Sequence, residues 1–124
     1  MLLHGRIDRI DENDAGEWAV LDYKTASQTT LKGRLGKCED HQLAFYGLIA
    51  DKPVAAGHYV ALELTKDKTG DVAAPNYDQW QHQLSAQIVA NLRAISTGAA
   101  LPASGIEAIC QYCDVRGLCR KGAW

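Results

Sequence analysis

The pattern of apolar and polar positions predicts three strands. Residues 2–10 alternate enough to form a strand, and the apolar run over residues 18–23 predicts a second one. The segment between them, residues 11–16, is rich in turn-forming residues, so the two strands are expected to pair as an antiparallel hairpin. Residues 57–64 predict the third strand. The predicted sheet is therefore small.

Two other segments show helical spacing. Residues 39–50 predict one helix, and residues 77–97 predict the longest one, which Gly98 ends. Apolar residues recur on one face of the long helix at steps of three and four: Trp80, Leu84, Ile88, Leu92 and Ile95. The polar segment 25–37 is predicted to be a loop or a mobile flap, and residues 65–76 are predicted to be a long loop.

The order β-β-α-β-α predicts the α/β class, with a small mixed sheet flanked by helices. A sheet of three strands is thin, and its second face needs cover that this sequence does not contain. Residues 1–98 are expected to form the core. Residues 99–124 are expected to be a linker and a cysteine-rich tail that packs on the core.

The length and net charge of the chain indicate which classes of protein it could belong to. The chain has 124 residues and a formal net charge of −2, which suits one domain with a modest core. No apolar run reaches the roughly 18 residues that a membrane span needs, and no signal peptide is visible, so a cytoplasmic location is expected. Mild acidity does not exclude nucleic-acid binding, because a local basic groove would suffice. Two sets of residues could supply such grooves: Lys24, Lys32, Arg34 and Lys37, and then Arg116, Arg120 and Lys121.

The candidate chemistry lies in the predicted hairpin. Asp8 falls on the first strand and Asp22 follows the apolar run of the second, so two carboxylates meet on neighbouring strands. A divalent cation between them would remove their repulsion, with the Tyr23 carbonyl as a further oxygen ligand. Lys24 shares a face with Asp22 and could stabilise charge that develops on a phosphate. The alternative is a surface hairpin with an ordinary Asp–Lys pair, worth about 0–1 kcal/mol.

Three of the four cysteines gather near the end of the sequence, with two residues between Cys110 and Cys113 and five between Cys113 and Cys119. In a secreted chain the cysteines could form disulfides. In a cytosolic chain this spacing favours a metal or cluster site.

Three motifs occur in order along the chain. Gly5 to Asp8 forms G-x-x-D, Asp22 to Lys24 forms D-x-K, and Gln42 with Tyr46 forms Q-x-x-x-Y. Together with the cysteine tail, these motifs resemble the PD-(D/E)xK nuclease superfamily in its RecB/AddB-like exonuclease branch. The resemblance spans residues 4–120.

The resemblance implies a restriction-endonuclease-like core whose N-terminal helix is missing here. It implies that Asp8 and Asp22 hold Mg²⁺ or Mn²⁺ and that Lys24 is the catalytic lysine. Gln42 and Tyr46 would contact the DNA strand or hold Lys24. It also implies a 4Fe–4S cluster, bound in the parent protein by Cys110, Cys113 and Cys119.

The chain departs from the family at two points. The family carries a histidine on a helix before the G-x-x-D strand, and His4 lies on the predicted strand, so that role is not assigned to it. The family's cluster also uses a cysteine far upstream, and Cys38 is expected to be a flap or core thiol instead. The chain is therefore expected to be a C-terminal fragment that self-associates through exposed sheet surface. Its cluster is expected to be incomplete, with a zinc site or a disulfide as the alternatives for the remaining thiols.

The leading functional hypothesis is metal-dependent hydrolysis of DNA, from the ends of single strands. In the parent protein, a helicase-like subunit or domain would feed the strand. One alternative is a catalytically impaired fragment that binds DNA without cleaving it. Another, from a different class, is a cysteine-rich zinc interaction module in which D-x-K is incidental.

Overall fold

A four-stranded mixed sheet lies in the first of two compact units, Met1–Ile88, and the second unit is Val89–Trp124. The computed structural model describes residues 2–37, 40–62, 69–101 and 103–119. Along the chain, the elements are β1 (Arg9–Glu12), β2 (Trp18–Lys24), α1 (Gln28–Lys37), α2 (Gln42–Ile49), β3 (Val54–Ala61), β4 (Gly70–Ala73), α3 (Tyr77–Ser96), α4 (Glu107–Cys110) and α5 (Arg116–Cys119).

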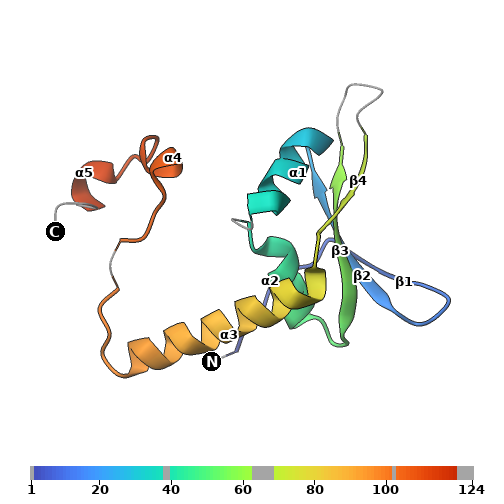
Figure 1. Ribbon diagram of the computed structural model, residues 1–124, viewed down its shortest axis with the longest axis horizontal. Coiled ribbons are helices and arrows are strands. Elements are labelled where there is room, and N and C mark those ends of the chain that lie inside the picture. Colours follow the sequence, from blue (N-terminus) through green and yellow to red (C-terminus); the bar gives the residue numbers. More distant parts are fainter. Residues whose placement is uncertain (1, 38–39, 63–68, 102, 120–124) are drawn as a thin grey trace. The chain divides into compact units, whose positions relative to one another are not determined.

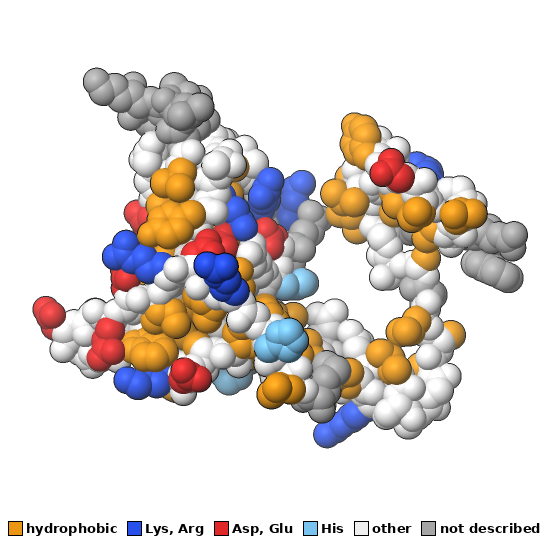
Figure 2. Space-filling model, turned by 180° about the vertical axis from the view of Figure 1, so that it is seen from behind, with side chains coloured by type: hydrophobic (Ala, Val, Ile, Leu, Met, Phe, Trp, Pro, Cys, Tyr) orange, Lys and Arg blue, Asp and Glu red, His pale blue; other side chains and the backbone are white. Residues whose placement is uncertain are grey.

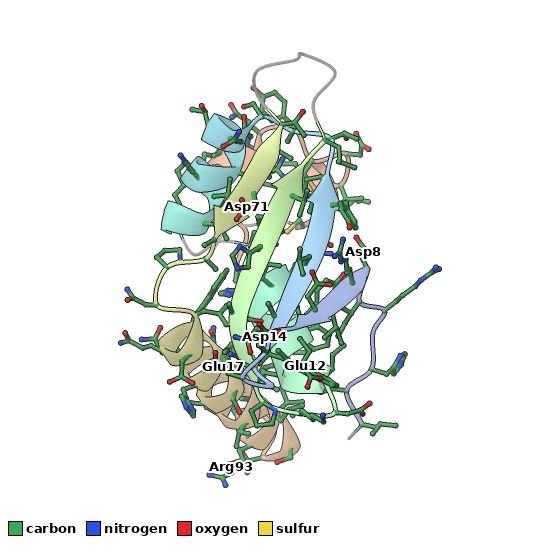
Figure 3. All side chains as sticks on the ribbon, turned by 90° about the vertical axis from the view of Figure 1, so that its right-hand side faces the viewer. Asp8, Glu12, Asp14, Glu17, Asp71 and Arg93 are labelled. Atoms are coloured by element: carbon green, nitrogen blue, oxygen red, sulfur yellow. The ribbon has the colours of Figure 1, made fainter. Side chains whose placement is uncertain are left out.

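The strands lie side by side in the order β1-β2-β3-β4 (Figure 3). β1 pairs antiparallel with β2, β2 pairs parallel with β3, and β3 pairs antiparallel with β4. A parallel pair needs a crossover connection, and α1 and α2 supply it on one side of the sheet (Figure 1). The core lies between that side of the sheet and the helices, with α1, α2 and the start of α3 contributing Leu31, Leu35, Leu43, Trp80 and Leu84.

The predicted α/β class and the mixed sheet are confirmed, but the sheet has a fourth strand. β4 lies in the segment that was predicted to be a loop. It was not predicted because its four residues, Gly-Asp-Val-Ala, show too little alternation of apolar and polar positions to indicate a strand. It forms because the edge of β3 accepts a partner, and Val72 becomes buried opposite Tyr59. β3 also begins earlier than predicted, at Val54. Residues 63–68, which include the end of the predicted third strand, lie outside the described residues.

The prediction of a loop or flap over residues 25–37 is wrong, because α1 fills most of this segment. The Ser27 hydroxyl accepts a hydrogen bond from the Thr30 amide at 3.2 Å, which caps the first turn. Leu31 and Leu35 lie one turn apart and are both buried. Burial of these two side chains outweighs the helix-weakening glycines that suggested a loop. Cys38, expected to be a flap or core thiol, lies outside the described residues.

The first predicted strand is displaced toward the turn. Only Arg9–Glu12 pairs with β2, and Asp8 lies at a bend just before it. The turn causes the shift, because the Asn13 side chain accepts hydrogen bonds from the amides of Ala15 at 3.0 Å and Glu17 at 2.9 Å. The turn therefore begins after Glu12, and the pairing register follows from it.

The two predicted helices are present with adjusted ends. α2 begins at Gln42, and α3 ends one residue earlier than predicted. Gly98 then adopts a φ of 87°, the left-handed conformation that commonly closes a helix. Trp80 and Leu84 of the predicted apolar face are buried, whereas Ile95, which belongs to the second unit, is exposed.

The second unit begins inside α3 and continues through the short helices α4 and α5. Packing of the cysteine tail on the core stays a prediction. None of the helices in the described part of the chain has the length and apolar character that crossing a membrane requires.

α2 lies close to the sheet because two glycines leave room for Tyr77. A Cβ on Gly47 would lie 2.6 Å from the Tyr77 hydroxyl, and one on Gly57 would overlap the Tyr77 ring. The Tyr77 hydroxyl donates a hydrogen bond to the Leu43 carbonyl at 2.7 Å. Tyr77 of α3 therefore ties α2 to β3.

Gly47→Ala tests this close approach. The added methyl group would overlap Gln81 and crowd Tyr77, so we expect the free energy of unfolding to fall by about 1–3 kcal/mol in urea denaturation. Gly33→Ala is the matched control, because nothing lies within 4 Å of that position and it sits inside α1. The control should be neutral or stabilise by up to about 1 kcal/mol. Equal destabilisation by the two variants would contradict the prediction.

Candidate active site

Asp22 and Lys24 project from β2 onto the helix-covered face of the sheet. The Asp22 side chain is only 3% exposed, while that of Lys24 is 24% exposed. The Lys24 ammonium lies 2.7 Å from Asp22 Oδ2. This is a largely buried ion pair, so the surface hairpin considered as the alternative does not describe it. Burial raises the cost of leaving either charge unpaired.

Gln42, the first residue of α2, joins this pair. Its Oε1 accepts a hydrogen bond from Lys24 Nζ at 2.6 Å. Its Nε2 donates to Asp22 Oδ1 at 3.1 Å and to the Tyr46 hydroxyl at 2.6 Å. The oxygen and both N–H groups of the amide are thus in use, which fixes its orientation. The structure therefore brings together four residues that the motifs singled out.

Asp8 lies beside this cluster, at a bend and not on a strand as predicted. Its Oδ2 accepts a hydrogen bond from the Tyr23 amide at 3.2 Å. Arg9 pairs with Leu21 in the sheet, so Asp8 precedes β1 at the level of Asp22. Asp8 is exposed, in contrast to the buried Asp22.

The pKa of Asp22 is raised above its usual value of 3.8, chiefly by burial. Lys24 opposes the shift through its hydrogen bond and its charge, while the negative charges of Asp8 and Asp40 add to it. Burial thus disfavours the charged form of the Asp22 carboxylate, and the ammonium of Lys24 stabilises that form.

Two further residues of this cluster, Asp40 and Tyr59, were not predicted from the sequence. Asp40 Oδ1 accepts a hydrogen bond from the Gln42 amide at 3.2 Å, at the start of α2. An aspartate just before a helical apolar run is a capping signal that could have identified it. Tyr59 is fully buried on β3 and pairs with Asp22 across the parallel register. No local signal distinguishes it from a core aromatic residue.

The donor set suits a hard divalent cation in its chemistry. Asp8 and Asp22 provide carboxylate oxygens, and the main chain of Tyr23 lies beside both. Within the described ranges, no group of three His, Cys, Asp or Glu residues is placed to hold a metal ion. Asp22 Oδ1 accepts a hydrogen bond from Gln42, whereas the buried Oδ2 has the ion-pair contact with Lys24 but no hydrogen-bond partner among the described residues. A cation at Oδ2 would therefore take the place of the Lys24 ammonium.

The predicted basic groove of Lys24, Lys32, Arg34 and Lys37 stays a prediction, and two of its members on α1 lie in different surroundings. Lys32 lines a pocket with Asp71 and Pro75, at the β4 edge of the sheet. Arg34 lies on another side of α1, where its charge lowers the pKa of Tyr59 against the larger opposing effect of burial. Figure 2 shows acidic and basic side chains close together on the visible face of the first unit. Lys32 and Arg34 therefore face different parts of the first unit.

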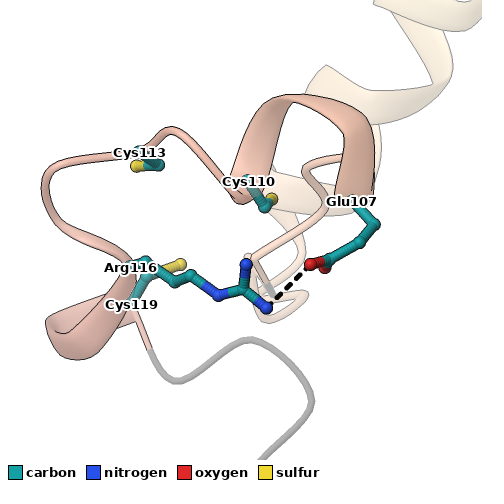
Figure 4. A pocket seen from close by; sticks show the side chains of 5 residues that line it. All are labelled: Glu107, Cys110, Cys113, Arg116 and Cys119. Carbon is teal, nitrogen blue, oxygen red and sulfur yellow. Dashed lines mark ion pairs between the residues drawn. The ribbon is translucent and has the colours of Figure 1, made fainter.

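The three tail cysteines line one pocket in the second unit (Figure 4). Cys110 closes α4, Cys119 closes α5, and Cys113 lies between the two helices. An ion pair of 2.7 Å between Arg116 and Glu107 joins α5 to α4. The three cysteines therefore line one cavity, although no group of three possible ligands among the described residues, cysteines included, is placed to hold a metal ion. Arg120 and Lys121 lie outside the described residues.

A family model described as the PD-(D/E)XK nuclease superfamily matches residues 1–120. The chain belongs to this superfamily. Its four-stranded mixed sheet with flanking helices is consistent with the restriction-endonuclease-like fold that the sequence predicted. No curated protein and no solved structure matches the chain. Assignment to the RecB/AddB-like branch stays a prediction.

The raised pKa of Asp22 predicts a specific dependence of stability on pH. The folded protein holds the Asp22 proton more tightly than the unfolded chain does, so Asp22 contributes stability at low pH. That contribution is lost as pH rises from about 3.8 through the pKa of the folded state. We therefore expect the unfolding free energy of Asp22→Asn, relative to wild type, to increase as pH rises through this range in urea titrations. A difference that stays constant or decreases would contradict the prediction.

Proposed function

We propose that this PD-(D/E)XK nuclease is a metal-dependent deoxyribonuclease of RecB/AddB-like type, which removes nucleotides from the ends of single-stranded DNA. The observation that carries the proposal is the cluster in which one glutamine amide contacts the aspartate, the lysine and the tyrosine of the motifs. A core that served stability alone would not need these buried polar groups, because apolar side chains could take their place without the cost of desolvation. Such a cluster is suited to holding one lysine in a fixed position beside a phosphate.

In this proposal, Asp8, Asp22 and the Tyr23 carbonyl hold Mg²⁺ or Mn²⁺. The bound ion would supply Lewis acidity and lower the pKa of a water that attacks the phosphodiester. Asp22 is held by Gln42 on Oδ1, so Oδ2, which now contacts Lys24, is the oxygen that would bind the cation. The buried carboxylate, disfavoured as a lone charge, gains from a divalent partner.

Lys24 is proposed as the catalytic cation. Its ammonium is bonded to Gln42 as well as to Asp22 and is partly exposed, so if a cation took its place on Asp22, the contact with Gln42 would keep it where it could face a phosphate. There it would neutralise charge that develops in the transition state or orient the attacking water. Tyr46, through Gln42, limits the rotation of the amide that holds Lys24.

A catalytically impaired DNA-binding fragment is the second candidate. It is favoured by the fact that Lys24 occupies Asp22 and that no metal-competent group of three ligands occurs among the described residues. The two candidates share the DNA partner and differ only in turnover. A helicase-like partner, a cytoplasmic location and self-association stay predictions in either case.

A cleavage assay separates the two candidates. Wild-type protein should shorten end-labelled single-stranded DNA in Mg²⁺ or Mn²⁺ and be inactive in EDTA. Asp22→Asn and Lys24→Met should each lose about 100-fold or more of the rate, because each removes a charge from the cluster. Asp71→Asn is the control, since this carboxylate lies on β4 and pairs with His58 instead. Binding without cleavage in wild type, measured by fluorescence anisotropy, would overturn the nuclease proposal in favour of the impaired fragment.

For the tail, we propose that Cys110, Cys113 and Cys119 are ligands of a 4Fe–4S cluster in the parent protein. Thiolates are the usual ligands of such clusters, and these three line one pocket. Three thiolates leave one iron without a protein ligand.

We therefore expect the cluster to be missing or incomplete when this chain alone is purified without oxygen. Iron analysis should find fewer than about four irons per chain, without the full absorbance band at about 400 nm. Cys113→Ser, which removes an exposed thiol, should lower any iron content further. A full complement of iron with the complete band would contradict the prediction.

A further inference from the structure

Tyr59 occupies the position directly beneath the candidate site. It lies in the middle of β3, opposite Asp22 on one side and Val72 on the other. It is fully buried, and it is the largest of the fully buried side chains. The side chains of Asp22 and Tyr59 are therefore neighbours on the same face of the sheet.

The Tyr59 ring is the third group in contact with the Lys24 ammonium. Lys24 Nζ lies over the ring at 5.5 Å from its centroid, in addition to its contacts with Asp22 and Gln42. A cation at this distance is attracted to the negative face of an aromatic ring, more strongly where water is largely excluded. The ring thus offers the ammonium a place that does not depend on Asp22.

The Tyr59 hydroxyl is buried near the charges of the cluster, without a hydrogen-bond partner among the described residues. Burial raises the pKa of Tyr59 first, and the Asp40 and Asp22 carboxylates raise it further. Asp40 accepts a hydrogen bond from the main chain of Gln42. A purely apolar position would be filled as well by phenylalanine, because a buried hydroxyl adds a desolvation cost.

We propose that Tyr59 is a positioning residue, whose ring holds Lys24 within reach of Gln42 when Asp22 is engaged by another cation. Without the ring, an ammonium displaced from Asp22 would turn toward solvent, since its flexible stem is tethered only through one hydrogen bond to Gln42. With the ring, the lysine keeps one location in both situations. The catalytic consequence rests on the proposed nuclease function, but the placement of Lys24 does not.

Nuclear magnetic resonance tests the placement directly, without DNA or metal. Protons over an aromatic ring are shifted upfield, so the ε-methylene protons of Lys24, assigned with Lys24→Met, should resonate upfield of those of other lysines. Tyr59→Phe should keep this shift and Tyr59→Leu should abolish it. Val54→Ala is the control, because it removes buried side-chain volume from the same strand without touching an aromatic ring, and it should leave the Lys24 shift unchanged. An unshifted Lys24 in wild type, or a shift that survives Tyr59→Leu, would overturn the proposal.

A second series of variants tests the same placement of Lys24 if Tyr59→Leu does not fold. Phenylalanine with one, two and three fluorine atoms at position 59 keeps the ring while its face becomes progressively less negative. We expect the upfield shift and the order of the Lys24 ammonium, read from its nitrogen relaxation, to decrease along the series. A side chain that acted only by filling space would give no trend, and a flat series would overturn the proposal.

The same variants give a kinetic readout in the nuclease assay. Because Tyr59 is buried and would not touch DNA, kcat should fall along the fluorinated series while KM for DNA stays the same. A parallel rise of KM would overturn the positioning role. If wild type does not cleave DNA but the resonance shift behaves as expected, the nuclease proposal fails and the placement of Lys24 stands.

Discussion

Most of the first unit is organised around one constraint, the burial of the Asp22 carboxylate. A charge in that position costs free energy unless other groups compensate it, and here an ammonium and an amide do so. The ammonium comes from Lys24, two residues along the same strand, so the strand itself guarantees its proximity. The amide comes from Gln42 on a different element, so its contact requires that α2 lie at the correct height above the sheet. The chemistry of the site and the packing of the core therefore cannot be separated.

The height of α2 is set at residues that do not touch the site. Gly47 and Gly57 leave space for Tyr77, whose hydroxyl then holds the α2 main chain at Leu43. A glutamine side chain has a fixed reach, so a displacement of the helix by a fraction of an ångström weakens its contacts with Asp22. Two glycines and a tyrosine that stand in no motif therefore help to place the motif residue Gln42 against Asp22.

Motifs in the sequence pointed to four of the residues that meet in the cluster, namely Asp22, Lys24, Gln42 and Tyr46. Asp22, Lys24 and Gln42 lie in short motifs, and the helix and strand that carry them show clear apolar periodicity. Features that depend on tertiary contacts were missed. α1 was not expected because its glycines argue against a helix, and only packing of its two leucines reveals why it forms. β4 is stabilised mainly by the strand beside it. Tyr59 acquires its role from the strand register, which a single sequence does not define.

The parallel pairing of β2 with β3 also has a consequence for the order of folding. The two hairpins, β1 with β2 and β3 with β4, join neighbours in the sequence and close short loops. Joining them requires the chain from α1 through α2 to close, and non-local pairings of this kind form slowly. Until then, Asp22 and Lys24 are in water and their charges cost nothing. The desolvation of Asp22 and Lys24 therefore depends on this non-local pairing, because of the residues that surround them, Gln42 lies in the crossover and Tyr59 in the strand that follows it.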